Sequence, residues 1–102
     1  MRLGTIAHGR SGDKGQLVNI SVIAFDLRDY PRLEREITAG RVGDHLAGLI
    51  HGKVVRYELP QLGALNFVFS RPPGDSVTRT LALDAHGKSL SSALLDMEIR
   101  DR

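Results

Sequence analysis

The chain has 102 residues, of which 41% are apolar and 25% charged, a composition typical of a globular protein with one domain, here residues 1–102. It contains no cysteine, which excludes a disulfide scaffold, a thiolate metal site and a cysteine nucleophile. The formal net charge is only +2, with interspersed basic and acidic residues and few aromatic ones. A nucleic-acid-binding protein usually concentrates its cations on one face, so we expect no nucleic-acid partner.

No targeting segment is evident, because the chain lacks a basic N-terminal head followed by a long apolar run. No apolar stretch approaches the roughly 18 residues that a membrane span requires, so we expect no membrane partner. The absence of cysteine suits a reducing compartment. We therefore expect a cytoplasmic protein.

Apolar periodicity predicts the elements of the N-terminal half. In chain order they are a strand over 3–7, a strand over 17–25, a helix that begins at Pro31 and stops at Gly40, and a helix from Arg41 to His51. The second strand is the strongest, with its even-numbered residues on a core face. On the first helix, Glu34, Arg35 and Glu36 are expected to form the solvated side.

The C-terminal half is predicted to contain strands over 53–59, 64–69 and 77–83, then a helix over 90–97 with Ser89 as its N-cap. In the strand over 53–59, apolar residues at 55, 57 and 59 alternate with polar ones, which indicates one wet face. This order of elements predicts an α+β two-layer sandwich, with an antiparallel or mixed sheet and helices on one face.

Between the first two predicted strands lies a glycine-rich run, from His8 to Gly15. Its three glycines predict a tight loop. Backbone N–H groups of such a loop can converge on an anion, and Arg10 and Lys14 would add positive charge. The alternative is an ordinary hairpin loop in which Asp13 pairs with one of these cations.

Other polar residues are candidates for the same site. They are Ser11, Gly12 and Asn19 near the run, Asn66 within an apolar strand, and Asp84 and Lys88 in a later turn. Asn66 has a structural alternative, since a buried amide must be hydrogen-bonded. As a nucleophile, Ser11 lacks the Gly-x-Ser-x-Gly elbow.

The histidines are candidates for general-base catalysis rather than for metal binding. His8 and His86 flank glycine turns, where either can serve a shared site. None of the chain's four histidines has the spacing of a metal-binding pair on one helix. We therefore expect no metal, and nothing in the sequence implies a cofactor.

Five motifs together resemble the C-terminal domain of the acyclic terpene utilisation (AtuA) proteins. They are Arg10-Ser11-Gly12-Asp13-Lys14-Gly15, Asn19-Ile20, Arg56-Tyr57-Glu58-Leu59-Pro60, Leu65-Asn66-Phe67 and Leu83-Asp84-x-x-Gly87-Lys88. The resemblance runs over nearly the whole chain and implies a ferredoxin-like α+β domain, set beside acyl-CoA enzymes of branched-chain or terpene breakdown. In longer members this unit follows a large N-terminal domain, which suggests a separately encoded partner. The stretch 72–75 is poorer in glycine than the family's loop, which weakens any binding role there.

Three functions follow. The first is a non-catalytic accessory domain, in which Arg10 and Lys14, with Lys88, bind a phosphate, a carboxylate or a CoA thioester. Gly12 and Gly15 would shape its loop, held by Asp13 and Asn19. The second is a small enzyme acting on an acyl thioester or hydroxy-acid with a histidine base. The third is a structural subunit. An exposed sheet edge also favours a homodimer.

Overall fold

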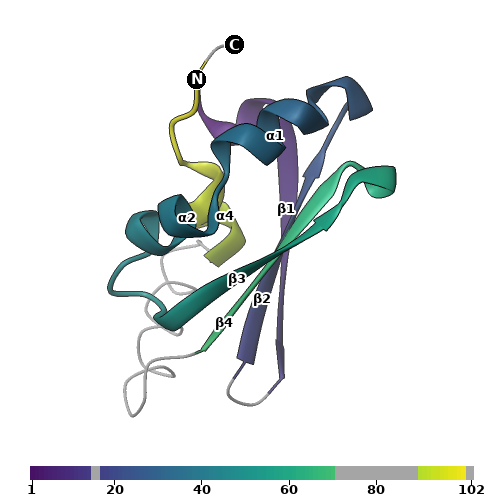
Figure 1. The fold of residues 1–102 in the computed structure, drawn as a ribbon. Coiled ribbons are helices and arrows are strands. Elements are labelled where there is room, and N and C mark those ends of the chain that lie inside the picture. Colours follow the sequence, from purple (N-terminus) through teal and green to yellow (C-terminus); the bar gives the residue numbers. More distant parts are fainter. Residues whose placement is uncertain (15–16, 71–89, 101–102) are drawn as a thin grey trace.

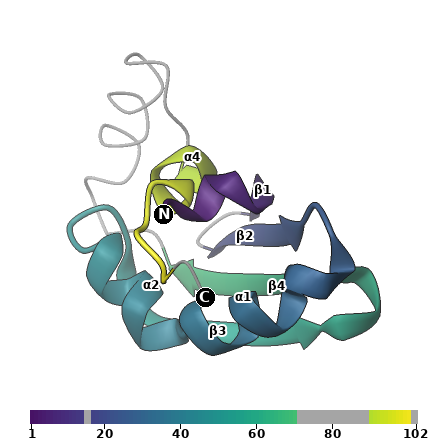
Figure 2. The same ribbon diagram turned by 90° about the horizontal axis from the view of Figure 1, so that it is seen from above.

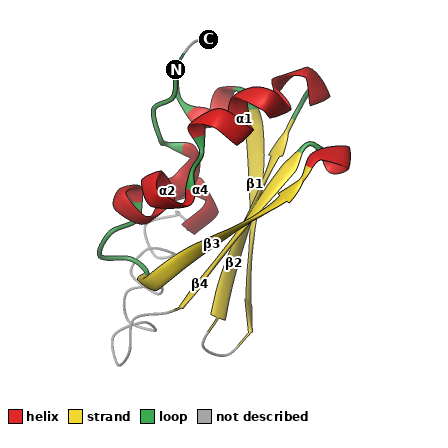
Figure 3. Cartoon of the chain, in the orientation of Figure 1, coloured by secondary structure: helices red, strands yellow, loops and turns green. Residues whose placement is uncertain are grey.

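The computed structural model describes residues 1–14, 17–70 and 90–100. In this part of the chain, four strands form one antiparallel sheet in the order β1-β2-β4-β3 (Figures 1 and 3). The strands are β1 Ala7–Lys14, β2 Leu17–Ala24, β3 His51–Leu59 and β4 Ala64–Ser70. The helices are α1 Tyr30–Glu36, α2 Ala39–His45 and α4 Leu90–Leu95, with 3-10 turns η1 Leu3–Thr5, η2 Leu27–Asp29 and η3 Pro60–Leu62.

The described helices α1, α2 and α4 lie on the same side of the sheet (Figure 1). Seen from above, α4 lies near β1, whereas α1 and α2 lie near β3 and β4 (Figure 2). The prediction of an α+β sandwich with an antiparallel sheet and helices on one face is confirmed. The predicted strand over 77–83 and the predicted N-cap Ser89 lie outside the described residues.

The core forms between the helices and one face of β2 and β4. In β2, Val18, Ile20 and Val22 are buried, as their alternation predicts. They stand opposite Phe69, Phe67 and Leu65 of β4 in the antiparallel register, and these three are buried as well. The helices and the residues that directly follow α1 and α2 close this face with Leu33, Ile37, Val42, Leu46 and Leu94. Burying two neighbouring apolar faces under helices is what fixes the register of the central strands.

The predicted glycine loop is wrong, because residues 7–14 form the edge strand β1. The predicted strand over 3–7 is wrong too, since Leu3–Thr5 is a 3-10 turn. β1 pairs along its whole length with β2, from Ala7 opposite Ala24 to Lys14 opposite Leu17. Glycines disfavour strands only weakly, and pairing with a strong neighbouring strand overrides that preference.

The helix boundaries also differ from the prediction, because Thr38 divides the helical region. Its hydroxyl accepts a hydrogen bond from the Arg41 N–H at 3.1 Å, which is the capping contact that starts α2. Gly40 therefore lies inside α2 and does not stop α1, which ends at Glu36. α2 itself ends at His45, well before the predicted end at His51.

In β3 the solvent-exposed face is the one that carries the apolar and aromatic residues. Val55, Tyr57 and Leu59 are 39%, 55% and 40% exposed. Arg56 instead turns toward the helices, where its guanidinium donates to the carbonyls of Glu34 and Ile37 at 2.7 and 3.0 Å. These carbonyls lie at the end of α1, where helical partners run out, so the cation satisfies acceptors that the helix leaves open.

Candidate functional site

The sheet face turned away from the helices brings several predicted site residues together. Directly opposed residues of antiparallel strands share a face, so the register defines this surface. Three cross-strand rows make up what we call the open face: His8–Ile23–Ala64–Leu59, Arg10–Ser21–Asn66–Tyr57 and Gly12–Asn19–Val68–Val55. The predicted candidates His8, Arg10, Gly12, Asn19 and Asn66 all lie in these rows.

The middle row of the open face is polar. The Asn66 side-chain amide donates to the Ser21 hydroxyl at 2.8 Å, which links β4 to β2. Beside this pair, the exposed Arg10 makes no hydrogen bond or ion pair with any residue that the structure describes. Tyr57 completes the row from β3. The row thus combines an unneutralised cation with fixed hydrogen-bonding groups.

Apolar side chains surround this polar row. Val55 and Leu59 flank Tyr57 on β3, and the neighbouring Leu17 of β2 is exposed as well. At the far end of the face, the His8 ring stacks on the exposed Phe25 ring, with centroids 5.3 Å apart. A surface that mixes exposed apolar groups with one free cation is chemically suited to binding a protein or an amphipathic ligand.

Other predicted candidates lie elsewhere. Ser11 alternates onto the helix side, where its hydroxyl accepts from the Ser91 N–H at 3.1 Å. Asp13 stands opposite the core residue Val18, and Lys14 closes the ladder opposite Leu17. The predicted site residues Gly15, Asp84, His86 and Lys88 lie outside the described residues.

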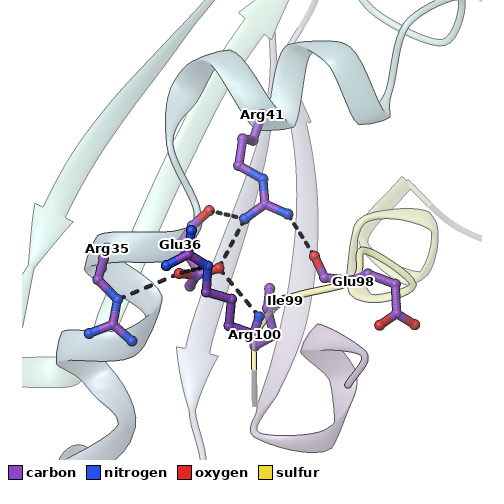
Figure 4. Close-up of a pocket in the computed structure, with 6 residues that line it drawn as sticks. All are labelled: Arg35, Glu36, Arg41, Glu98, Ile99 and Arg100. Carbon is purple, nitrogen blue, oxygen red and sulfur yellow. Dashed lines mark hydrogen bonds and ion pairs between the residues drawn. The ribbon is translucent and has the colours of Figure 1, made fainter. Parts of the chain in front are cut away.

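A second polar feature lies in the helix layer and was not predicted from the sequence. Glu36 was predicted to be solvated, yet it is only 6% exposed. Three arginines from different segments contact it: Arg35 beside it, Arg41 of α2 and Arg100 near the C-terminus (Figure 4). We call these four residues the Glu36 cluster. No sequence signal links them, because the contact between α1 and residue 100 exists only in three dimensions.

The environment of Glu36 favours its ionised form. Burial by itself would raise the pKa of this carboxyl. The hydrogen bonds from the Arg100 N–H and the Arg35 side chain, with the charges of Arg100 and Arg41, outweigh burial and lower the pKa. Glu36 is therefore a buried anion held by surrounding cations.

Neither feature gathers the ligands of a metal ion. Over residues 1–14, 17–70 and 90–100, no three His, Cys, Asp or Glu side chains come together as a metal site would require. None of the helices in the same ranges has both the length and the apolar character to cross a bilayer.

The sheet, its helix layer and its open face define a two-layer α+β domain. A family model, the AtuA ferredoxin-like domain, matches residues 1–100. The chain therefore belongs to this family, and the ferredoxin-like α+β fold implied by the five motifs is confirmed. Searches of curated proteins and of solved structures found no match.

Proposed function

We propose that this chain is a non-catalytic accessory domain that docks through its open face onto a large AtuA-type domain. The metabolic setting follows from the family resemblance: acyl-CoA enzymes of terpene or branched-chain breakdown. The supporting observation is the unneutralised Arg10, set in a row of polar groups with exposed apolar side chains on both sides. An interface of this kind uses apolar burial for affinity and one charge for specificity.

The charge of the open face indicates the chemistry of its partner. The two acidic residues of the described strands stand opposite core positions, Asp13 opposite Val18 and Glu58 opposite Leu65. In the described part of the chain, the three rows that define the open face contain Arg10 and no aspartate or glutamate. A second copy docked face to face would bring like charge to the surface, whereas a partner with a carboxylate among apolar groups would complement it.

The anion-binding role predicted for the glycine run takes a different form here. β1 is a paired strand, so its N–H groups do not converge as they would in a loop. Arg10 can still receive an anion, because its side chain is exposed on the open face. We expect that anion to be a carboxylate of the docked partner.

The test is a binding measurement with a large AtuA-type domain from the same organism. Size-exclusion chromatography with light scattering gives the mass of the complex, and calorimetry gives its affinity. We expect a one-to-one complex whose affinity falls at least tenfold in Arg10→Glu. Arg28→Glu is the matched control, because Arg28 is an exposed cation of η2 that lies outside the three rows. The affinity of this variant for the large domain should differ from that of the wild type by less than twofold.

Three results would overturn the proposal. The first is no complex with the large domain. The second is a complex that Arg10→Glu and Arg28→Glu weaken equally. The third is a wild-type homodimer that Arg10→Glu dissociates, which would make a second copy the occupant. Circular dichroism of each variant checks that the fold is intact, which we expect because Arg10 has no partner among the described residues and the Arg28–Asp26 pair is exposed.

A further inference from the structure

The Glu36 cluster lines a hollow of about 560 Å³ in the helix layer, on the other side of the sheet from the open face. Its walls are Arg35, Glu36, Arg41, Glu98, Ile99 and Arg100, contributed by the end of α1, by α2 and by the C-terminal segment (Figure 4). The C-terminal segment is far from α1 and α2 in sequence and contacts both of them here. The hollow is therefore a product of the tertiary structure and owes nothing to the docking proposed above.

Arg41 holds this hollow in shape. Its guanidinium donates to the Glu36 carbonyl at 2.8 Å, to the Glu36 carboxylate at 3.2 Å and to the Glu98 carbonyl at 2.6 Å. These bonds tie α2 to the end of α1 and to the C-terminal segment. Arg41 is thus occupied by structural contacts, and its role is to fix the positions of the other two arginines.

Arg35 and Arg100 are held much more loosely. The guanidinium group of each approaches the Glu36 carboxylate through its Nε, at 3.5 and 3.9 Å, and the Arg100 backbone N–H also donates to that carboxylate. The side chains are 56% and 80% exposed. Because a guanidinium has five N–H donors, most of the donors of both groups remain available at the rim of the hollow.

The charges around the hollow do not balance. The Glu98 carboxylate lies 3.3 Å from the N-terminal ammonium group and is neutralised by it. Three guanidinium groups therefore share one carboxylate, that of Glu36. The described residues leave a local excess of two positive charges. A phosphate group carries up to two negative charges and accepts paired N–H donors from arginine.

We propose that the Glu36 cluster binds the phosphate group of a small molecule through Arg35 and Arg100. The Glu36 carboxylate attracts both guanidinium groups to the rim of the hollow, and Arg41 anchors Glu36. The volume exceeds that of inorganic phosphate, so the site accommodates a larger phosphate ester as well. Inorganic phosphate, pyrophosphate and coenzyme A share the required chemistry.

Calorimetric titration of the whole chain tests this site. The probes are inorganic phosphate, pyrophosphate, coenzyme A and dephospho-coenzyme A, with sodium chloride as the control anion. We expect saturable binding of at least one phosphate compound and none of chloride. Tighter binding of coenzyme A than of its dephospho form would identify a phosphomonoester as the preferred group.

The decisive variant is Arg35→Gln/Arg100→Gln, which removes two cations and leaves Arg41 in place. We expect it to weaken phosphate binding at least tenfold. Arg28→Gln/Lys53→Gln removes two cations outside the hollow and should leave binding within twofold. Three results would overturn the proposal. They are no phosphate binding by the wild type, an equal loss of affinity in both double variants, and a loss of affinity in Arg10→Glu alone. Because Arg10 lies on the other face of the sheet, the phosphate-site proposal and the docking proposal can be contradicted independently of each other.

Discussion

The Ser11 hydroxyl accepts a hydrogen bond from the Ser91 N–H at 3.1 Å, between two residues 80 positions apart in sequence. Ser11 lies in β1, and Ser91 lies in the first turn of α4. The first N–H groups of a helix have no acceptor within the helix, so the strand supplies one. The Ser11 hydroxyl of the glycine-rich run therefore has a structural role on the helix side of the sheet and is not part of the open face.

We expect Ser11→Ala to destabilise the protein by about 1 kcal/mol, because a donor of α4 loses its acceptor. For a domain of this size the melting temperature should fall by about 4–8 °C. Ser11→Thr keeps the hydroxyl and should retain most of the stability. Thermal unfolding followed by circular dichroism measures both, and equal melting temperatures for Ser11→Ala and wild type would contradict the capping role.

Gly9 and Gly12 in β1 should respond differently to alanine. A Cβ at Gly9 would lie 3.3 Å from both the Ser21 carbonyl oxygen and the Ser91 Cβ, whereas at Gly12 the nearest atoms belong to the flexible Asn19 amide. We expect Gly9→Ala to cost about 1 kcal/mol through displacement of α4. Gly12→Ala should be neutral or slightly stabilising, because alanine lowers the entropy of the unfolded chain.

Urea unfolding of the two glycine variants measures this difference. Equal unfolding midpoints would mean that α4 does not approach β1 closely at Gly9. A large loss in Gly12→Ala would mean that Asn19 cannot move aside.

Glu36 should make stability depend on pH. Its pKa in the folded protein is below its ordinary value of 4.5, so the folded state binds fewer protons than the unfolded chain at mildly acidic pH. The stabilisation is complete above that ordinary value and is lost as the pH falls through the lowered pKa. Glu36→Gln should cost about 1–2 kcal/mol at pH 7, since the arginines it leaves can still reach water.

Urea unfolding of wild type and Glu36→Gln at pH 7 and at about pH 3 separates this effect from general acid sensitivity. The difference between the two proteins should shrink at the lower pH, because protonation of Glu36 removes part of the negative charge that the arginines stabilise. An undiminished difference would show that the carboxylate charge is not what stabilises the cluster.

The Tyr30 hydroxyl is buried and has no hydrogen-bond partner among the described residues. Burial, aided by the charges of Glu34 and Glu58, raises the pKa of this phenol. We expect Tyr30→Phe to stabilise the protein by about 1 kcal/mol, because it removes an unsatisfied polar group and keeps the ring. Differential scanning calorimetry measures the change. Tyr57→Phe is the control, since its exposed hydroxyl should matter little, and a lower melting temperature for Tyr30→Phe would contradict the expectation.

The alternation of apolar and polar residues predicted burial correctly where the apolar face of an element is covered. The alternation of β2 predicted which of its residues form the core, and one of them is Ile20, which stands opposite Phe67 of β4. The same reasoning failed for β3, where Val55 and Tyr57 are apolar or aromatic yet exposed. Their alternation is real, but the sequence cannot say whether a helix covers that face.

The residues of the candidate site were also only partly predictable. Arg10, Asn19 and Asn66 were selected one by one, and the sheet register places them on one face. The Glu36 cluster was not predicted, because only some of its members are close to one another in sequence. Arg100 reaches Glu36 across 64 positions, a distance at which no spacing rule applies.

The sequence by itself determined the class of this protein: an α+β fold, two core strands, and five motifs that identify the AtuA ferredoxin-like family. These features depend on short-range periodicity and on residue identity. Only the tertiary structure decided that the glycine run is an edge strand, that its Arg10 faces away from the helices, and that Glu36 is buried among arginines. Each of these depends on which distant segment packs alongside, because pairing and burial are long-range contacts that local composition does not encode.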